Sequence, residues 1–357
     1  PEAIKRPLRE WTRDVGRVSP KQGSRDAIGD AEYAARAVAE KAIFAEQVEV
    51  HDLPPIFHYW SNHWLRPEME RLGFSNPDQF IAQYLQRTCA ELARPVRFAS
   101  LGCGNCDTEI RVARLLIDSG VRDFVIECVD INEAMLERGR KLAIEAGVDA
   151  HIKARQGDFN RWRPPQSYDA IVAHQSLHHV VELEDLFSAI ADALAPHGRF
   201  IAADIIGRNG HMRWPEAMAI IHEYWRELPR GYRWNVQMRR RETLLEYWDC
   251  STEGFEGIRA QDILPLLVER FDFEFFFAFG NLIDPFIDRS FGPHFNADAT
   301  WDRDFIDRVH ARDEAELRAG TITPTHVLAV MRKRPYHGEC RIRAGLAPEF
   351  CVRRPDA

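Results

Sequence analysis

The feature that most restricts the fold of this chain is a regular alternation of two hydrophobic periods, which begins near residue 97. Short apolar runs typical of buried strands alternate there with segments whose apolar residues recur at helical spacing. The runs predict strands at 96–101, 124–129, 150–154, 168–173, 198–206, 271–279 and 326–331, and the intervening patterns predict helices at 108–118, 133–146 and 184–194. Because right-handed crossovers carry each helix back over the sheet, this order indicates an α/β fold with a mostly parallel, seven-stranded sheet. Its ligand site is expected at the carboxyl ends of the strands.

Composition excludes several classes of protein. The chain has 357 residues, of which 45% are apolar and 29% charged, as in a globular protein with a sizeable core. A net charge of −8 argues against a general nucleic-acid binder. No apolar run is long enough to span a bilayer and no signal-peptide core is seen near residue 1, so we expect a cytoplasmic protein without a membrane span.

Three additions surround the alternating core. Residues 1–95 predict a helical N-terminal cap, and 96–335 the main domain. Helical patterns at 208–260 and a segment at 281–324 with a charged helix are expected as insertions into that domain. The second insertion is where a homodimer contact would form. The basic tail, 336–357, is expected to be loosely ordered.

A glycine turn follows the first expected strand. Gly102 and Gly104 allow close approach of the backbone to a nucleotide, whereas Asp107 replaces the glycine that a dinucleotide fingerprint requires. Asp130 ends the second strand, where its carboxylate can accept both hydroxyls of a ribose. The alternative is that Asp130 or Asn132 only caps the next helix.

A second polar turn follows the third strand. Asp158 can accept from an exocyclic amine there, and Phe159 can lie against a purine ring. Glycine, aspartate and asparagine also form ordinary turns, which is the alternative.

Taken together, these segments resemble the class I S-adenosylmethionine-dependent methyltransferases, which have a Rossmann-like fold. The resemblance covers residues 97–206, with a glycine motif at 101–104, an acid at Asp130, Gly157-Asp158, Tyr168-Asp169-Ala170-Ile171-Val172, Ser176-Leu177-His178-His179-Val180 and Leu194-Ala195-Pro196-His197-Gly198-Arg199-Phe200. It implies S-adenosylmethionine as the cofactor, bound by Gly102, Cys103, Gly104, Asn105, Glu109, Asp130, Ile131, Asp158, Phe159 and His174. Ser100 and Cys106 depart from the family pattern, and Glu109 is expected to supply the carboxylate that Ser100 lacks.

The resemblance implies an in-line displacement, in which an acceptor nucleophile attacks the sulfonium methyl group and the enzyme supplies alignment and desolvation. His178 and His179 are the candidate catalytic bases. The alternative is that this pair only shapes the cofactor pocket. No metal site is expected, either at His174 with this pair or at the lone C-x-x-C of Cys103 and Cys106, since neither shows a recognisable ligand spacing.

The insertion at 208–260 bears on the acceptor. Its stretch 208–241 carries eight arginines and three acids, so Arg213 and Arg233 are candidates to bind an anionic acceptor. A solvated helix face or an interface is the alternative. Aromatic residues such as Tyr59 and Trp64 are candidates to line the acceptor pocket. The segment 208–233, with Trp214-Pro215-Glu216 and Leu228-Pro229-Arg230-Gly231-Tyr232-Arg233, weakly resembles methyltransferases encoded near glycan-assembly enzymes.

The sequence therefore predicts an enzyme that methylates an oxygen or nitrogen of a small molecule or glycan in small-molecule biosynthesis, with no nucleic-acid partner. Two alternatives remain open. One is an enzyme that cleaves or cyclises S-adenosylmethionine without methylating. The other is a cofactor-binding scaffold without catalysis, which is considered because Ser100 and Cys106 depart from the family pattern.

Overall fold

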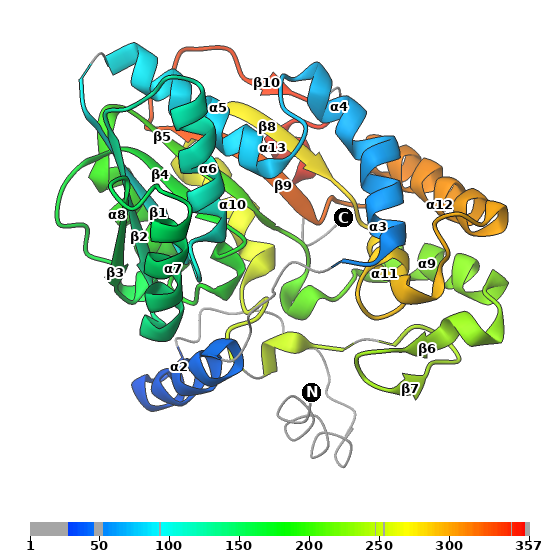
Figure 1. Cartoon of the computed structure of the whole chain (residues 1–357). Coiled ribbons are helices and arrows are strands. Elements are labelled where there is room, and N and C mark those ends of the chain that lie inside the picture. Colours follow the sequence, from blue (N-terminus) through cyan, green and yellow to red (C-terminus); the bar gives the residue numbers. More distant parts are fainter. Residues whose placement is uncertain are drawn as a thin grey trace.

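The computed structural model describes residues 28–45, 53–92, 94–246, 248–252, 254–343 and 345–353 (Figure 1). Its centre is an eight-stranded sheet in the order β10-β8-β9-β5-β4-β1-β2-β3. The strands are β1 Val96–Leu101, β2 Phe124–Asp130, β3 Ile152–Gln156, β4 Tyr168–His174, β5 Leu194–Ile205, β8 Asp272–Phe279, β9 His326–Arg332 and β10 Arg341–Ile342. Strands β1 to β5 are mutually parallel, and β9 is antiparallel to both β5 and β8. Strand order therefore brings the carboxyl ends of β1, β2 and β4 to one edge of the sheet.

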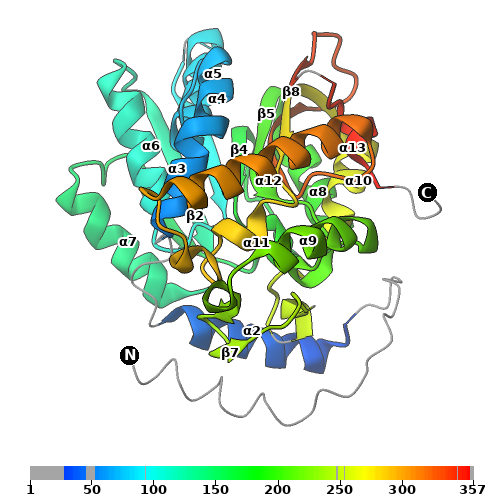
Figure 2. The same ribbon diagram turned by 90° about the vertical axis from the view of Figure 1, so that its right-hand side faces the viewer.

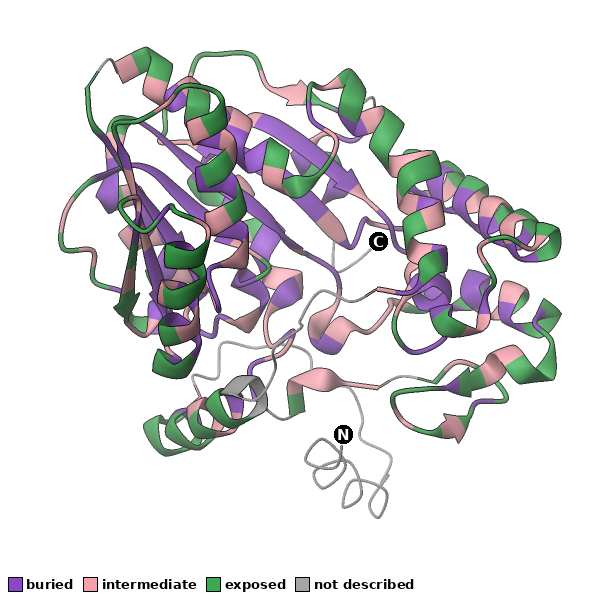
Figure 3. Ribbon diagram, in the orientation of Figure 1, coloured by how far each residue is buried: buried purple, intermediate pink, exposed green. Residues whose placement is uncertain are grey.

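Helices cover both faces of the sheet, as the near-continuous burial of the strands requires. The helices are α2 Asp30–Ala45, α3 Pro55–Trp60, α4 Arg66–Arg71, α5 Pro77–Leu92, α6 Asp107–Asp118, α7 Glu133–Glu145, α8 Leu183–Ala193, α9 Pro215–Glu227, α10 Ala260–Arg270, α11 Asp284–Ile287, α12 Thr300–Ala319 and α13 Pro348–Cys351. Apolar side chains of α5, α6 and α7 form one core with the sheet, and those of α8, α9, α10 and α12 form the other. Figure 3 shows this as buried strands between helices that are exposed on their outer sides.

Local sequence explains where the site-bearing helices begin. Helix α7 starts after Asn132, whose side chain accepts from the backbone N–H of Ala134 and so satisfies one of the free donors of the first turn. Helix α6 starts after Cys106, which has a left-handed backbone with φ of 59°. Both helices therefore begin at the carboxyl edge of the sheet, directly after β2 and β1.

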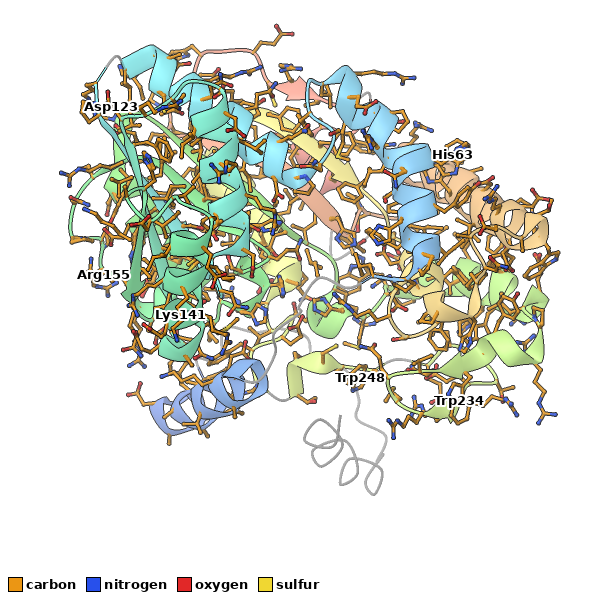
Figure 4. All side chains as sticks on the ribbon, in the orientation of Figure 1. His63, Asp123, Lys141, Arg155, Trp234 and Trp248 are labelled. Carbon is orange, nitrogen blue, oxygen red and sulfur yellow. The ribbon has the colours of Figure 1, made fainter. Side chains whose placement is uncertain are left out.

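The insertions form a second layer beside the sheet. Figure 2 shows α12 running across the body next to α3, α9 and α11. Phe305, Ile306 and Val309 of α12 are fully buried in the core, so most of this helix is part of the fold. The hairpin of β6 Trp234–Asn235 and β7 Arg240–Arg241 projects further, and Trp234, labelled in Figure 4, is 40% exposed.

The structure corrects three expectations. The sheet has an eighth strand, because β10 pairs in parallel with β8 at Phe275 and Phe276. The tail is not loosely ordered over 345–353, since Leu346 and Cys351 are buried in the main core. Strand β3 lies two residues later than the expected 150–154, and β5 begins at Leu194 rather than at 198.

Residues 1–27 of the expected N-terminal cap lie outside the described residues. None of the helices in the described ranges combines the length and apolar character needed to cross a bilayer.

Candidate active site

A cavity of about 160 Å³ lies at the carboxyl edge of the sheet, beside the ends of β1, β2 and β4. It is lined by Glu40, Lys41, Gly102, Cys103, Gly104, Asn105, Asp107, Thr108, Glu109, Asp130, Ile131, Asn132, Met135, Asp158, Phe159, Asn160, His174, Gln175, Ser176, His179 and Phe255. All of the residues predicted to bind the cofactor are among them. The structure thus brings those side chains together on one surface.

The glycine turn after β1 approaches the segment after β4 closely. Gly102 has φ of 69°, and a Cβ added to it would lie 2.5 Å from the Cβ of Ser176. Gly104 also has a positive φ, and its N–H donates to Asp130 Oδ2 at 2.9 Å. A side chain at Gly102 would fill the space in front of the turn, so only glycine keeps the backbone exposed to a ligand.

Asp130 is nearly buried and fixed by the backbone. Its Oδ1 accepts from the N–H of Asn132 at 2.8 Å, while its Oδ2 holds the glycine turn. Burial raises the pKa of Asp130, against the effect of these two hydrogen bonds. The two sequence alternatives are not exclusive, because Asn132 caps α7 and leaves Asp130 on the cavity wall.

Ser100 and Glu109 form a buried pair below the same turn. Ser100 Oγ donates to Glu109 Oε1 at 2.5 Å. Glu109 Oε2 is buried without a hydrogen-bond partner among the described residues. Burial raises the pKa of Glu109 to about 8. A buried carboxylate oxygen without a partner, on the wall of a cavity, suits a cationic ligand group such as an ammonium.

Asp158 and Phe159 also line the cavity, and Asp158 is bound by the N-terminal helix. Tyr33 of α2 donates its hydroxyl to Asp158 Oδ2 at 2.7 Å, and the N–H of Asn160 donates to Oδ1 at 3.0 Å. Phe159 is 8% exposed and lines the cavity. The carboxylate of Asp158 therefore already has two donors, which the sequence analysis did not anticipate.

Three thiols lie close together at the glycine turn, at Cys103, Cys106 and Cys128. The Sγ atoms of Cys103 and Cys106 are 3.7 Å apart. Burial raises the pKa of the Cys103 thiol. Cys128 comes from the middle of β2, so the C-x-x-C spacing alone gave no indication of this third sulfur.

His178 and His179 follow β4 in a 3₁₀ turn, Leu177–His179, and face different surroundings. His179 lines the cavity, and its Nδ1 lies 2.7 Å from Glu40 Oε1 of α2. His178 is buried behind it, with Nδ1 2.6 Å from Asp204 Oδ1 and Nε2 3.4 Å from Glu256 Oε1. Burial alone would lower the pKa of His178, but Asp204 and Glu256 outweigh it and raise the pKa to about 10.

Three residues that surround the two histidines were not predicted from the sequence: Asp204, His211 and Glu256. Glu256 lies between His178, His179 and His211, within hydrogen-bond range of His211 Nε2 and 3.5 Å from His179 Nε2. Burial would raise the pKa of Glu256, but the surrounding imidazoles hold it well below its ordinary value. Asp204 could have been found from the sequence, because it is a carboxylate in the apolar carboxyl-terminal part of strand β5. His211 and Glu256 are 45 residues apart in the chain, and no local pattern marks them.

Two of the predicted acceptor residues lie elsewhere. Tyr59 donates its hydroxyl to Asp307 at 3.0 Å, and Trp64 donates its indole N–H to Asp307 Oδ1 at 2.7 Å. Tyr59 lines a shallow surface hollow with His58, His63 and others, and this hollow shares no lining residue with the cofactor cavity. These side chains attach the helical segment around α3 to α12, so the structure does not bring them to the site.

The predicted arginines are also used inside the fold. Arg213 pairs with Asp284 at 2.8 Å, with both side chains largely buried. Arg233 donates to the backbone carbonyl of Leu228 at the end of α9, at 2.8 Å from Nη2. Because these guanidinium groups satisfy internal acceptors, they do not support the expectation of an anionic acceptor.

The sheet order, the glycine turn and the acid after β2 define a Rossmann-like domain that binds a nucleotide-type cofactor at its carboxyl edge. Comparison with known proteins identifies the cofactor. Residues 99–198 match the family model described as "Methyltransferase domain". Over these residues the chain carries a methyltransferase domain of the S-adenosylmethionine-dependent type.

Characterised relatives share this part of the chain. The 27-O-demethylrifamycin SV methyltransferase of Amycolatopsis mediterranei is 26% identical over an alignment of 195 residues, and the alignment covers 49% of this chain and 68% of that protein. The ubiquinone/menaquinone biosynthesis C-methyltransferase of Azotobacter vinelandii is 27% identical over 109 residues, 30% of this chain and 42% of that protein.

Two solved structures are similar over more of the chain. An O-methyltransferase from a trans-AT PKS multienzyme of Brevibacillus brevis, in complex with S-adenosyl-L-homocysteine, has 16% identity and a TM-score of 0.43, with 81% of this chain and 86% of that chain covered. The geranyl diphosphate C-methyltransferase of Streptomyces coelicolor has 14% identity and a TM-score of 0.41, with 84% and 98% covered.

Proposed function

We propose that this enzyme methylates a hydroxyl oxygen of a small-molecule acceptor. The observation that carries the proposal is the position of His179. It lines the cofactor cavity and lies directly between Glu40 and Glu256. A hydroxyl nucleophile must lose a proton during methyl transfer, and this side chain is positioned at the cavity wall to receive one. The oxygen specificity in the name of the rifamycin relative also supports an oxygen acceptor.

The cavity residues fit S-adenosylmethionine in the roles that we propose for them. Asp130 would hold the ribose hydroxyls, Phe159 would lie against the purine, and Glu109 would hold the amino group with its unpartnered Oε2. When bound, the cofactor supplies an electrophilic methyl group on a sulfonium. Around it the chain excludes water with Phe255 and α2, and orients His179 through Glu40.

The proton step that we propose places His179 Nδ1 against Glu40 and leaves Nε2 to accept the acceptor's proton. The bound cofactor would supply the methyl group to the acceptor oxygen, and His179 Nε2 would take the proton that this oxygen loses and pass it to water. His178 lies behind this ring and acts through position, because Asp204 and the surrounding fold bury it.

The test is a turnover assay with methyl-deuterated S-adenosylmethionine and a panel of phenols, aliphatic alcohols, sugars and amines. We expect S-adenosylhomocysteine and a deuterated methyl ether by mass spectrometry. His179→Gln should lower the rate at least tenfold, while His337→Gln, at an exposed histidine, should not change it. Methylthioadenosine as the product would indicate cofactor cleavage instead, and methylated amines without ethers would refute the oxygen acceptor.

A further inference from the structure

A group of metal-ligating atoms lies next to the cofactor cavity, outside the residues assigned to the cofactor. A ring nitrogen of His178, one of His211 and a carboxylate oxygen of Glu256 all lie within 4.8 Å of one another. His178 Nε2 and Glu256 Oε1 are 3.4 Å apart. This separation is close to that of two ligands on one tetrahedral metal ion, for which metal–ligand distances of about 2.1 Å give about 3.4 Å.

The three ligands come from separate segments that the fold joins through backbone contacts. His178 follows β4, His211 lies in the 3₁₀ turn Asn209–His211 after β5, and Glu256 belongs to the segment before α10. The N–H of Gly210 donates to the carbonyl of Gly257 at 2.8 Å. Asp249 also lies close to Gly210. A Cβ on Gly210 would lie 2.0 Å from Asp249 Oδ1, so only glycine fits between Asp249 and Gly257.

The backbone at His211 is in a conformation that side chains rarely adopt. His211 has φ of 55°, directly after Gly210 at 64°. Non-glycine residues in this left-handed region are sparse and concentrate at ligand and active sites, where the surrounding structure holds them. Here that conformation coincides with an imidazole Nε2 in contact with Glu256.

His178 has the second partner that metal-binding histidines require. Its Nδ1 lies 2.6 Å from Asp204 Oδ1, and Asp204 Oδ2 accepts from the N–H groups of Ser176 and Leu177 at 2.8 and 2.7 Å. A carboxylate accepts hydrogen bonds, so Nδ1 carries a proton toward Asp204. Nε2 faces Glu256, and a metal ion bound there would take the place of any proton on Nε2. A carboxylate–histidine pair of this kind fixes the tautomer and orientation of a metal ligand.

We propose that His178, His211 and Glu256 bind one divalent transition-metal ion, and that the hydroxyl of the acceptor occupies an open coordination position on it. Two imidazoles and one carboxylate suit Zn²⁺, Mn²⁺ or Fe²⁺ rather than Mg²⁺. The Glu256 side chain is 38% exposed, which leaves the group accessible from outside. The role of the ion in acceptor binding rests on the proposed function, while the ion site itself does not.

His179 is not one of the proposed metal ligands. Its Nε2 lies 3.5 Å from Glu256 Oε2, on the cavity side of the cluster. A hydroxyl bound to the ion would therefore lie between the metal and the proposed proton acceptor. The bound cation would lower the pKa of that hydroxyl and help to orient its oxygen toward the cofactor.

The first experiment measures metal binding without turnover. The chain of 357 residues, dialysed against a chelator and then against buffer, is titrated with Co²⁺ by visible absorption and with Zn²⁺ by calorimetry. We expect one equivalent to bind with micromolar affinity or better. Glu256→Gln and His211→Asn should weaken binding at least 100-fold, and Asp204→Asn about 10- to 100-fold. Asparagine is chosen at position 211 because it tolerates a positive φ but is too short to replace the imidazole.

His337→Ala is the matched control, since His337 is exposed and lies outside the cluster. It should bind the metal as the wild type does. Absence of stoichiometric binding, or equal binding by Glu256→Gln and His211→Asn variants that retain the wild-type circular dichroism spectrum and melting temperature, would overturn the site.

Cofactor binding separates the two proposals. S-adenosylmethionine affinity should change less than twofold in His211→Asn, because His211 does not line the cofactor cavity. Full methylation by chelated protein and by Glu256→Gln would overturn the metal's role in acceptor binding and leave the methyltransferase proposal intact. If the protein binds the metal ion but forms no methylated product, the proposed methyl transfer is wrong and the metal site stands.

Discussion

The two sides of the site are built in different ways. On the cofactor side, carboxylates at strand ends are held by backbone N–H groups a few residues away or across neighbouring strands, as Asp130 is by Gly104 and Asn132. On the other side, side chains from α2, the turn after β4 and the insertion after β5 hold one another, as Glu40, His179 and Glu256 do. The first arrangement follows from the sheet, whereas the second depends on long-range side-chain contacts.

The largest effect that we predict is on stability, from an arginine of the insertion. Arg213→Met should lower the free energy of unfolding by about 3–5 kcal/mol, because it leaves the buried carboxylate of Asp284 without its guanidinium partner. Urea unfolding measures this. Arg308→Met is the control, since Arg308 pairs with Glu227 at the same 2.8 Å but on an exposed surface, and should cost about 0–1 kcal/mol. Equal stability of the two variants would contradict a structural role for Arg213.

The next largest effect concerns the glycine turn of the cofactor side. Gly102→Ala should lower the free energy of unfolding by about 3 kcal/mol, since a left-handed alanine costs about 1–2 kcal/mol and its Cβ also meets Ser176. Gly120→Ala is the control, because Gly120 has φ of 92° with nothing within 4 Å of an added Cβ. Only the backbone cost should remain there. Similar losses in both variants would mean that the close approach to Ser176 is unimportant.

The acid after β2 should affect ligand binding more than stability. Asp130→Ala removes the carboxylate that would accept the ribose hydroxyls, so calorimetry should show S-adenosylmethionine and S-adenosylhomocysteine binding weakened about 100-fold, or about 2.7 kcal/mol. Asp123, labelled in Figure 4, directly precedes the same strand at its opposite end and is exposed. Asp123→Ala should bind both ligands normally. Retained affinity in Asp130→Ala would remove the ribose assignment.

The smallest effect is a pH dependence. The pKa of Glu109 is raised to about 8 by burial, so the carboxyl group is mostly protonated at pH 7 in the unliganded protein. An ammonium ligand needs the ionised form, and the proton must leave when it binds. S-adenosylmethionine affinity should therefore rise with pH, approaching tenfold per unit well below pH 8 and levelling off above it.

Two controls test this dependence. Glu109→Gln should bind S-adenosylmethionine with little dependence on pH, and methylthioadenosine, which lacks the amino acid part, should bind the wild type with no such slope. A pH slope that persists in Glu109→Gln would assign the effect to another group.

The strands and the cofactor residues could be predicted because each depends on local patterns. Apolar runs predicted the seven long strands, and the residues that follow them, such as Gly102, Asp130 and His174, meet at one edge because parallel strands end together. Strand β10 escaped prediction because it has two residues and no apolar run.

The side of the site formed by α2 and the insertion could not be predicted, because the folded structure decides which charged side chains bind to other parts of the chain. The arginines of 208–241 formed a recognisable cluster in the sequence, yet Arg213 and Arg233 are engaged by Asp284 and by backbone carbonyls. Conversely, Glu40 and Glu256 have no pattern around them and become important only where α2 and the insertion meet. Residue type indicated the available chemistry, but not where it would be placed.

The attachment of α2 has a consequence for the order of events in a catalytic cycle. In the described part of α2, Tyr33 and Glu40 are the buried side chains. Tyr33 packs in a small apolar cluster with Val181 and Phe255, and Arg36 donates to the carbonyls of Ser251 and Gly254 at 2.8 and 2.9 Å. This small contact surface should cost less to separate than the apolar core of the sheet, so we expect α2 to detach while the sheet stays folded. Detachment removes the wall formed by Glu40 and Lys41. Exchange of spent for fresh cofactor then requires only this local opening, and raised ionic strength should speed it.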